Sequence, residues 1–203
     1  MEIKTATWGW KPPQYELVKD DIFKIYFNPI LSEETITYTT KDENDNIISE
    51  TETKTVPVYT VNYYQESNPE LLEAINSNNS TLVSRILLKC RINAYDNSDF
   101  VNSFSLNGIS TWLDKLTRIG LVNSTTIAKN SGAINTTLWF GTNSFEVNCD
   151  VALALLSSLE NYALHCYNVT AQHLADAELL ASSEELDNYD YTAGYPDKLI
   201  LNI

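Results

Sequence analysis

The strongest constraint on the fold is the stretch from Asp150 to Leu180, in which apolar side chains recur at a nearly heptad spacing. A period close to 3.5 residues is typical of a long amphipathic helix that packs one stripe against its neighbours. At 1.5 Å per residue, such a helix would be roughly 45 Å long. We expect its inward stripe to be Val151, Leu155, Leu159, Tyr162, Cys166, Val169, His173, Ala177 and Leu180.

The first third of the chain has the two-residue period of β-strands. Ile22–Phe27 is a short β-prone run, and Thr35–Thr40 alternates apolar and threonine side chains before the polar segment Asp42–Asn46. A polar turn between two such runs predicts a hairpin. The return strand, Ile47–Tyr64, is rich in threonine, and Pro57 should place it at a sheet edge or break it in two.

A helix start follows the strands. In the tripeptide Asn68-Pro69-Glu70, Asn is a good N-cap, Pro is favoured at the first helical position and Glu suits the first turn. The polar residues 76–80 should interrupt this helix, which resumes as far as Tyr95. We therefore predict two short helices or one bent helix.

This change of period suggests a division of the chain near residue 66. We predict an N-terminal β module over residues 1–66, used for attachment or interaction, and an α+β domain over residues 67–203. The fold class is then α+β, with an N-terminal antiparallel β module followed by helices, short hairpins and a long C-terminal amphipathic helix.

The second domain should contain two hairpins around a helix. Asn107-Gly108 is the strongest two-residue hairpin signal, and a second hairpin joins Asn135–Phe140 to Ser144–Asn148. The intervening helix begins at about Leu113, and Gly132 stands just beyond its end as a C-cap. Its inner face should be Leu113, Leu116, Ile119 or Gly120, Asn123 and Ile127.

The charge of the chain restricts its partners. Thirteen Lys and Arg against 27 Asp and Glu give a formal net charge of -14. Nucleic acid and anionic lipid would be repelled, so neither is an expected partner. The most apolar long segment, Val151 to Tyr167, is interrupted by polar residues and falls short of a membrane span. We expect contacts with neutral or basic protein surfaces.

No arrangement of residues predicts catalysis, a cofactor or a metal. Glycine-rich phosphate loops and a nucleophile elbow are absent. His165 and His173 are eight residues apart, too far along a helix to chelate one ion. Asp42-x-Asn44-x-Asn46 opens like a calcium loop, but its later positions do not fit. Paired carboxylates at Asp187 and Asp190 remain the rival interpretation, that of a glycan-active enzyme.

Aromatic residues supply the candidate partner-binding sites, which are Trp8, Trp10, Tyr59, Tyr63 and Tyr64. Two tryptophans near a terminus either dock on their own chain or insert into a neighbouring subunit, since Trp is a typical interface anchor. The tyrosine-rich segments Tyr59–Tyr64 and Tyr189–Tyr195 could form a binding patch or a sugar-stacking platform. Packing on a strand face is the preferred interpretation, because β-propensity alone favours tyrosine there.

The order of features from about Leu106 to Pro196 resembles a phage family of uncharacterised domains found in tail-fibre-associated proteins. The matching pieces are a strand with LNG, TWLDKLTRIGL, TTLWFGTNSFEVN, DVALALLSSLENYALHCYNVTAQHLADAELL and SSEELDNYDYTAGYP. The shared pattern includes Trp112, Arg118, Trp139, Leu155 and Glu184-Glu185-Leu186. This resemblance implies association with a virion or tail fibre, and no known catalytic residues.

These observations lead to one functional expectation with two alternatives. We expect a non-catalytic structural component of a tailed-phage virion, made in the host cytoplasm, that contacts other virion proteins and forms homo-oligomers. The three cysteines, without a C-x-x-C pair, fit reduced thiols. The first alternative is a glycan-binding or glycan-active tail protein, and the second is a cytoplasmic phage-encoded host-interaction factor.

Overall fold

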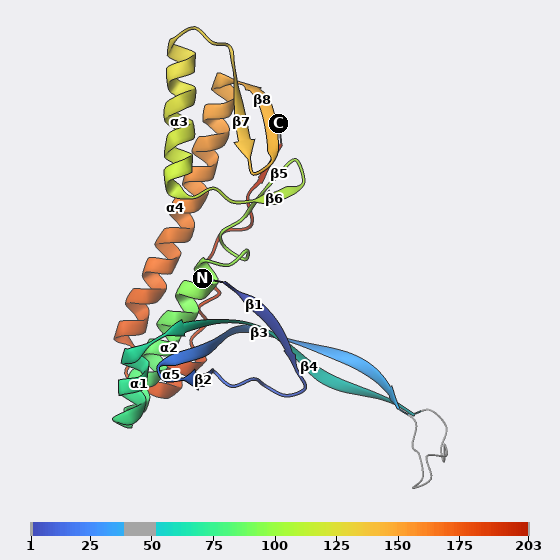
Figure 1. Ribbon diagram of the computed structural model, residues 1–203, viewed down its shortest axis with the longest axis vertical. Helices are drawn as coiled ribbons and strands as arrows, with labels where there is room; N and C mark the ends of the chain where they lie inside the picture. The colour runs from blue at the N-terminus through green and yellow to red at the C-terminus, as the bar shows by residue number, and fades with distance from the viewer. Residues whose placement is uncertain (1, 39–51, 203) are drawn as a thin grey trace. The chain divides into compact units, whose positions relative to one another are not determined.

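The computed structural model describes residues 2–38 and 52–202. The chain is an α+β protein with an N-terminal antiparallel sheet followed by helices, as predicted. It forms two compact units (Figure 1). Unit 1 comprises residues 1–94 and 181–189, and unit 2 comprises residues 95–180 and 190–203.

Unit 1 contains a four-stranded antiparallel sheet with the strand order β1-β4-β3-β2. The expected run at Ile22–Phe27 and the described part of the run at Thr35–Thr40, as far as Tyr38, belong to one long strand, whose register shifts between Phe27 and Ile30. Asn28 has a φ of 49° at this bulge, which lets the strand continue. The strands are β1 (Lys4–Trp8), β2 (Tyr15–Lys19), β3 (Ile22–Tyr38) and β4 (Glu52–Ser67).

Two helices follow the sheet, as the capping signals predicted. Helix α1 (Pro69–Asn76) begins after Asn68, whose side-chain oxygen accepts a 2.9 Å hydrogen bond from Leu71 N. Helix α2 (Ser80–Asp96) begins after Asn79, which caps Leu82 N in the same way at 3.0 Å. The predicted interruption at residues 76–80 is therefore confirmed, with two separate helices.

The units do not divide at residue 66, where the change of period had suggested a boundary. Helix α1 and α2 as far as Ala94 belong to unit 1, together with α5 (Ser183–Asn188). A sheet with one apolar face needs cover, and the helices supply it. Tyr64 on β4 donates a 3.4 Å hydrogen bond to the Cys90 carbonyl on α2. The first unit is thus a sheet-and-helix unit and not a β module alone.

Unit 2 is built around one long helix. The Asn107-Gly108 hairpin is confirmed, with positive φ angles of 49° and 81° at these residues, as its tight turn requires. The second predicted hairpin is confirmed as well. The elements are β5 (Phe104–Leu106), β6 (Ile109–Thr111), α3 (Lys115–Asn130), β7 (Asn135–Phe140), β8 (Asn143–Asn148), α4 (Cys149–Leu179) and β9 (Ile200–Leu201).

Helix α4 has the predicted length and period, but its buried stripe starts one residue later than expected. Val151 and Leu155 were expected inside, whereas Ala152 and Leu156 are the buried residues. From Leu159 onward the stripe follows the prediction closely. Eight of the ten buried residues of α4 recur at alternating intervals of four and three residues, which is a heptad pattern. They are Ala152, Leu156, Leu159, Ala163, Cys166, Thr170, His173 and Ala177.

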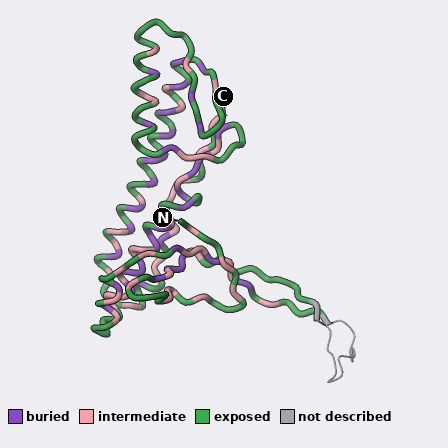
Figure 2. Tube along the Cα trace, viewed as in Figure 1, coloured by how far each residue is buried: buried purple, intermediate pink, exposed green. Residues whose placement is uncertain are grey.

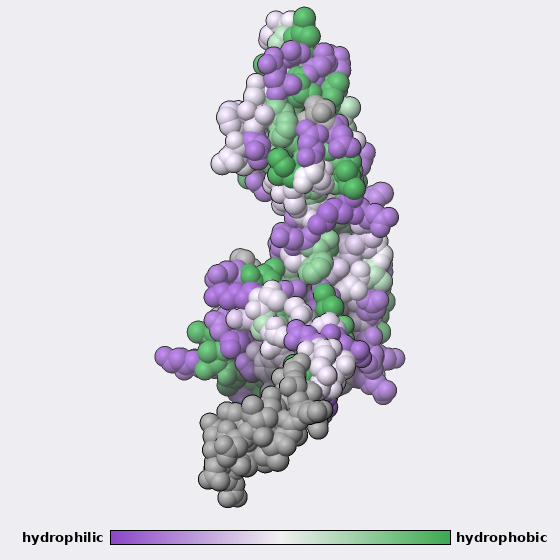
Figure 3. Space-filling model, turned by 90° about the vertical axis from the view of Figure 1, so that its right-hand side faces the viewer, coloured by the Kyte–Doolittle hydropathy of each residue, from purple (hydrophilic) through white to green (hydrophobic). Residues whose placement is uncertain are grey.

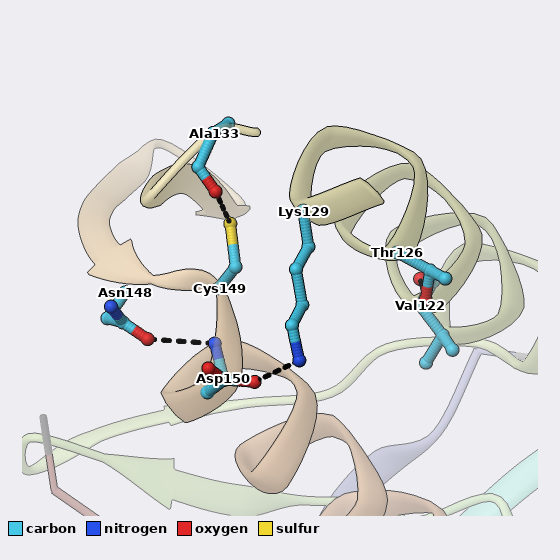
Figure 4. A network of polar contacts seen from close by, with 7 residues as sticks. All are labelled: Val122, Thr126, Lys129, Ala133, Asn148, Cys149 and Asp150. Atoms are coloured by element: carbon cyan, nitrogen blue, oxygen red, sulfur yellow. Dashed lines mark hydrogen bonds and ion pairs between the residues drawn. The ribbon is translucent and has the colours of Figure 1, made fainter. Parts of the chain in front are cut away.

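Polar contacts at the start of α4 account for this phase (Figure 4). Cys149 Sγ is 3.5 Å from the Ala133 carbonyl oxygen, and Asn148 caps Asp150 N at 2.9 Å. The Asp150 carboxylate bonds the Lys129 ammonium group on α3. With Cys149 turned inward and Asp150 toward α3, Val151 faces solvent.

Helix α3 is turned opposite to the prediction. Leu116 and Ile127, expected on its inner face, are exposed, Leu116 to 81%. The buried residues are Arg118 and Thr125, and the α3 trace is largely exposed in Figure 2. Ion pairs from Arg118 and Lys129 to α4 fix this orientation. Gly132, with a φ of 90°, follows the C-cap of α3 as predicted.

The core of unit 2 is one apolar cluster to which the hairpins and α4 all contribute. Tyr162 illustrates its closure, because its hydroxyl donates a 3.0 Å hydrogen bond to the Val101 carbonyl. The cluster consists of Val101, Phe104, Leu106, Leu113, Leu138, Phe140, Val147, Ala152, Leu156, Leu159, Tyr162 and Cys166.

Candidate interaction surface

Four of the five predicted partner-binding residues lie on one surface of unit 1. Residues directly opposite each other in antiparallel strands point to the same face of a sheet. The register pairs Trp8 with Tyr59, and Tyr63 with Tyr26. Trp10 contacts Trp8 from the loop that follows β1. We call this surface, made of Trp8, Trp10, Tyr26, Tyr59 and Tyr63, the aromatic face.

Four rings of the aromatic face, those of Trp10, Trp8, Tyr26 and Tyr63, form a connected row. Trp10 meets Trp8 at a centroid distance of 5.5 Å, and Trp8 meets Tyr26 at 5.7 Å, both edge to face. Tyr26 lies 5.7 Å from Tyr63. Such pairs are favourable aromatic geometries, so the row is held in place by its own contacts. Only Trp10 is largely uncovered, at 67% exposure.

At the Tyr26–Tyr63 end of the row, the charged residues Glu16 and Lys24 contact the two tyrosines. The Tyr26 hydroxyl donates a 2.8 Å hydrogen bond to Glu16 Oε2, which also lies 3.5 Å from Lys24 Nζ. Lys24 Nζ stands 5.7 Å from the Tyr63 ring centre, a cation-π distance. Burial, followed by the contact with Glu16, raises the pKa of Tyr26 above its ordinary range. Tyr26 therefore stays protonated and anchors the face.

Tyr64 does not belong to this surface, contrary to the prediction. It lies on the opposite face of the sheet, directly across from Ile25, and is only 2% exposed. Its hydroxyl is 3.2 Å from Glu66 Oε1 and 3.4 Å from the Cys90 carbonyl oxygen. Burial raises its pKa strongly. Adjacent strand residues point to opposite faces of a sheet, so Tyr63 and Tyr64 cannot both lie on the aromatic face.

Next to the aromatic face, β3 and β4 continue as a two-stranded ribbon (Figure 1). Strand β1 ends opposite Tyr59 and β2 ends its pairing at Ile25. Beyond these points, residues 32–38 pair only with residues 52–58 within the described part of the chain. We call this ribbon the β-arm. Its outer edges carry backbone groups that a further strand could bond.

The β-arm contains the edge position predicted for Pro57, which lies opposite Glu33. A proline and charged side chains discourage indiscriminate edge-to-edge pairing, which a bare ribbon of this length would invite. The predicted return strand Ile47–Tyr64 includes this part of β4, although residues 47–51 lie outside the described residues. So does the segment Asp42–Asn46 with its calcium-loop-like opening.

The residues considered for chemistry do not come together. His173 is buried, with Nε2 2.9 Å from the Ala193 carbonyl oxygen, whereas His165 is exposed. Asp187 belongs to unit 1 and Asp190 to unit 2, where Asp190 accepts hydrogen bonds from Thr192. Over residues 2–38 and 52–202, no group of three His, Cys, Asp or Glu side chains is placed to hold a metal ion.

The tyrosines of the C-terminal segment pack inside unit 2. Tyr95 meets Tyr195 at 5.5 Å and Tyr191 at 5.9 Å between ring centroids. The Tyr195 hydroxyl lies 2.9 Å from Thr170 Oγ1, and burial raises the pKa of Tyr195 to about 12. Packing therefore explains this tyrosine-rich segment, and it offers no stacking platform.

Several of the residues on which the resemblance to a phage family depends have structural roles. Arg118 is buried and lies 5.4 Å from the Trp112 ring centre. Glu185 completes the capping box of α5, and Leu186 is fully buried. Trp139 differs, because it is 58% exposed on the β7–β8 hairpin. Figure 3 looks at that side of unit 2, where apolar side chains reach the surface between polar ones.

No protein-family model, no curated protein and no solved structure matches the chain. Among the helices that the structure describes, none is both long enough and apolar enough to cross a lipid bilayer.

Sequence reasoning missed Tyr26 as a member of the aromatic face. Its neighbours Phe23, Ile25 and Phe27 lie on the opposite, buried face. The alternation within Ile22–Phe27 could have revealed it, because Lys24 and Tyr26 are the polar members of that run. The strands that position the face, β1 and β2, were not predicted either.

Proposed function

We propose that this chain is a non-catalytic structural component of a tailed-phage virion and acts through protein-protein contacts made by unit 1. The observation that carries the proposal is the position of the exposed Trp10, which ends an aromatic row beside a β-arm with open edges. A rigid aromatic anchor and unpaired strand edges are two established means of binding another chain.

The β-arm supports an assembly role on energetic grounds. A two-stranded ribbon is marginally stable by itself, because it cannot bury an apolar face on both sides. Ile36 remains 44% exposed on the arm. Pairing with a strand of a neighbouring subunit, either the same protein or another virion protein, would cover such side chains and satisfy the edge. We therefore propose that the chain forms homo-oligomers within the particle.

The net charge of -14 supports neutral or basic protein surfaces as partners. The assignment to a tailed-phage particle rests on the resemblance of the region from Leu106 to Pro196. The proposed location is therefore the virion, after synthesis in the host cytoplasm.

Mass spectrometry of purified particles of the encoding phage tests this proposal directly. We expect peptides of this chain at a fixed ratio to known structural proteins. Particles from which the chain is absent would overturn the virion assignment and favour the alternative of a host-interaction factor that remains outside the particle.

The surface responsible is tested by complementation with variants. We expect Trp10→Ala to reduce incorporation strongly, because truncating a central interface Trp commonly costs about 2 kcal/mol or more in binding. Trp139→Ala is the matched control, since Trp139 is similarly exposed but lies on unit 2. Equal incorporation of both variants would contradict a role for the aromatic face.

A further inference from the structure

Unit 1 contains a cavity of about 500 Å³ that lies apart from the aromatic face and the β-arm. Its size is within the roughly 300–1,000 Å³ typical of small-molecule sites. All of its lining residues belong to unit 1, and they come from the loop before β2, the facing ends of α1 and α2, and α5. The residues that matter for recognition are Gln14, Tyr15, Asn79, Val83, Ser84 and Asp187.

Two polar groups in this cavity lack partners within the described part of the chain. Ser84 is buried, at 6% exposure, and its hydroxyl makes no hydrogen bond there. The Asp187 carboxylate makes neither a hydrogen bond nor an ion pair there. Since none of the described residues has a buried side-chain oxygen or nitrogen without a partner, the Ser84 hydroxyl is open to the cavity, where water or a ligand can hydrogen-bond to it.

Two amide side chains that line the cavity use only their oxygen atoms within the unit. Gln14 Oε1 accepts a 3.0 Å hydrogen bond from Arg91 Nη2, which leaves the Gln14 amide nitrogen as a donor. Asn79 Oδ1 caps α2, which leaves the Asn79 amide nitrogen as a second donor. The lining residues also include Asn78, Tyr15, Ser80 and Ser183, so the cavity offers amide donors, one carboxylate acceptor and several hydroxyls that can donate or accept.

This combination discriminates between classes of ligand. An anion would satisfy the amides but meet the Asp187 carboxylate, and no Lys, Arg or His lines the cavity. A simple cation would satisfy Asp187 but leave both amide donors without acceptors. A neutral ring with adjacent hydroxyl groups satisfies both, because each hydroxyl donates and accepts.

The walls fit the same class. Tyr15, Ile75 and Val83 present apolar surface beside the polar groups, and the C–H face of a sugar ring packs on such a wall. We propose that this cavity binds a neutral hexopyranose unit of a glycan, with Asp187 and Ser84 as the groups that hydrogen-bond its hydroxyls.

The site binds without hydrolysis. Glycoside cleavage in most families needs two carboxylates flanking the bond, and Asp187 is the one carboxylate among the lining residues. The binding site is independent of the proposed assembly role, because the aromatic face contributes no lining residue.

Two-dimensional ¹H–¹⁵N NMR of the full chain tests the proposal. The probes are the methyl glycosides of glucose, galactose and mannose, each titrated to about 50 mM, which detects a Kd of about 10 mM or below. We expect at least one to shift the Ser84 and Gln14 amide signals saturably. Methylammonium and inorganic phosphate are the comparison ligands, and neither should bind.

Asp187→Asn should weaken the sugar titration about tenfold, because a charged acceptor is lost. Glu184→Gln is the matched control, since it removes a carboxylate from α5 that does not line the cavity. Failure of all three sugars, an equal response of both variants, or binding of methylammonium alone would overturn the proposal. None of these outcomes affects incorporation into particles, which is measured separately.

Discussion

Trp8 and Trp10 meet edge to face at 5.5 Å, yet they play different parts, because Trp8 packs on Tyr26 while Trp10 is largely exposed. We expect Trp8→Ala to lower the free energy of unfolding of unit 1 by about 2 kcal/mol, from lost ring contacts and apolar burial. Trp10→Ala should change it by less than about 0.5 kcal/mol. Urea unfolding followed by tyrosine and tryptophan fluorescence measures both.

These two substitutions separate a docked residue from an interface residue. A Trp10→Ala variant as destabilised as Trp8→Ala would place Trp10 in the packed part of unit 1. In that case the aromatic face would offer no exposed anchor, and the complementation result would need another explanation.

The Cys90 thiol should be unusually unreactive. Burial, followed by the nearby Glu66 carboxylate, raises its pKa to about 12. The thiolate is the reactive form, so its fraction should rise about tenfold for each pH unit throughout the accessible range. We expect the rate of reaction with a disulfide reagent to increase in this way from pH 7 to 10. Cys90→Ser identifies the signal, and a rate that levels off near pH 9 would contradict the raised pKa.

Local signals in the sequence predicted the ends and turns of the fold well. The Asn68 cap and the Asn107-Gly108 turn depend only on their immediate neighbours, and both are present. The heptad spacing likewise predicted the length and period of α4. Such features follow from backbone geometry that a few adjacent residues decide.

The orientation of elements could not be predicted in the same way. On α3, Leu116 and Ile127 formed the more apolar stripe, but the inward face contains Arg118, whose partner Glu160 is 42 positions away. A pattern within one helix cannot reveal that an arginine is compensated by a distant carboxylate. Aromatic alternation suggested a binding surface at residues 59–64, but the face of each tyrosine depended on the register of β4 with β1 and β3.

The candidate cavity was likewise beyond local patterns. It brings together Gln14, Ser84 and Asp187, which are separated by up to 173 positions in the sequence. Asp187 had been considered only as a partner of Asp190, a neighbour in sequence. Asp187 belongs to unit 1 and Asp190 to unit 2, so pairing them by their proximity in the sequence did not point to the cavity.

Asp96 should make the stability of unit 2 depend on pH. Burial raises the pKa of its carboxyl, which the 2.8 Å hydrogen bond from Thr170 Oγ1 only partly offsets. The folded state therefore binds this proton more tightly than the unfolded chain. The resulting stability is complete below about pH 3.8 and is lost as the pH rises through the raised pKa.

Asp96→Asn removes this ionisation and keeps an oxygen that can accept from Thr170. We expect the free energy of unfolding of the variant, relative to the natural chain, to increase as the pH rises from about 3.5 and to become constant near neutrality. Thermal unfolding at a series of pH values measures it. The exposed Asp99 offers the control Asp99→Asn, and a variant difference that does not vary with pH would contradict the prediction.

Replacing either residue of the Arg118–Glu160 ion pair should destabilise unit 2, and replacing the arginine should cost more unfolding free energy. Arg118 Nε donates a 2.6 Å hydrogen bond to Glu160 Oε2, and its Nη1 donates a 2.7 Å bond to the Leu113 carbonyl. The arginine side chain is buried and the glutamate half exposed.

Arg118→Met leaves the carbonyl unpaired and should cost about 2–3 kcal/mol of unfolding free energy, whereas Glu160→Gln, which retains an acceptor, should cost under about 1 kcal/mol. Lys129→Met, which breaks the exposed pair at the other end of α3, should cost less unfolding free energy than Arg118→Met, because solvent screens that pair. Urea unfolding followed by circular dichroism at 222 nm gives the three values. Equal losses for Arg118→Met and Lys129→Met would show that burial of Arg118 does not set the orientation of α3.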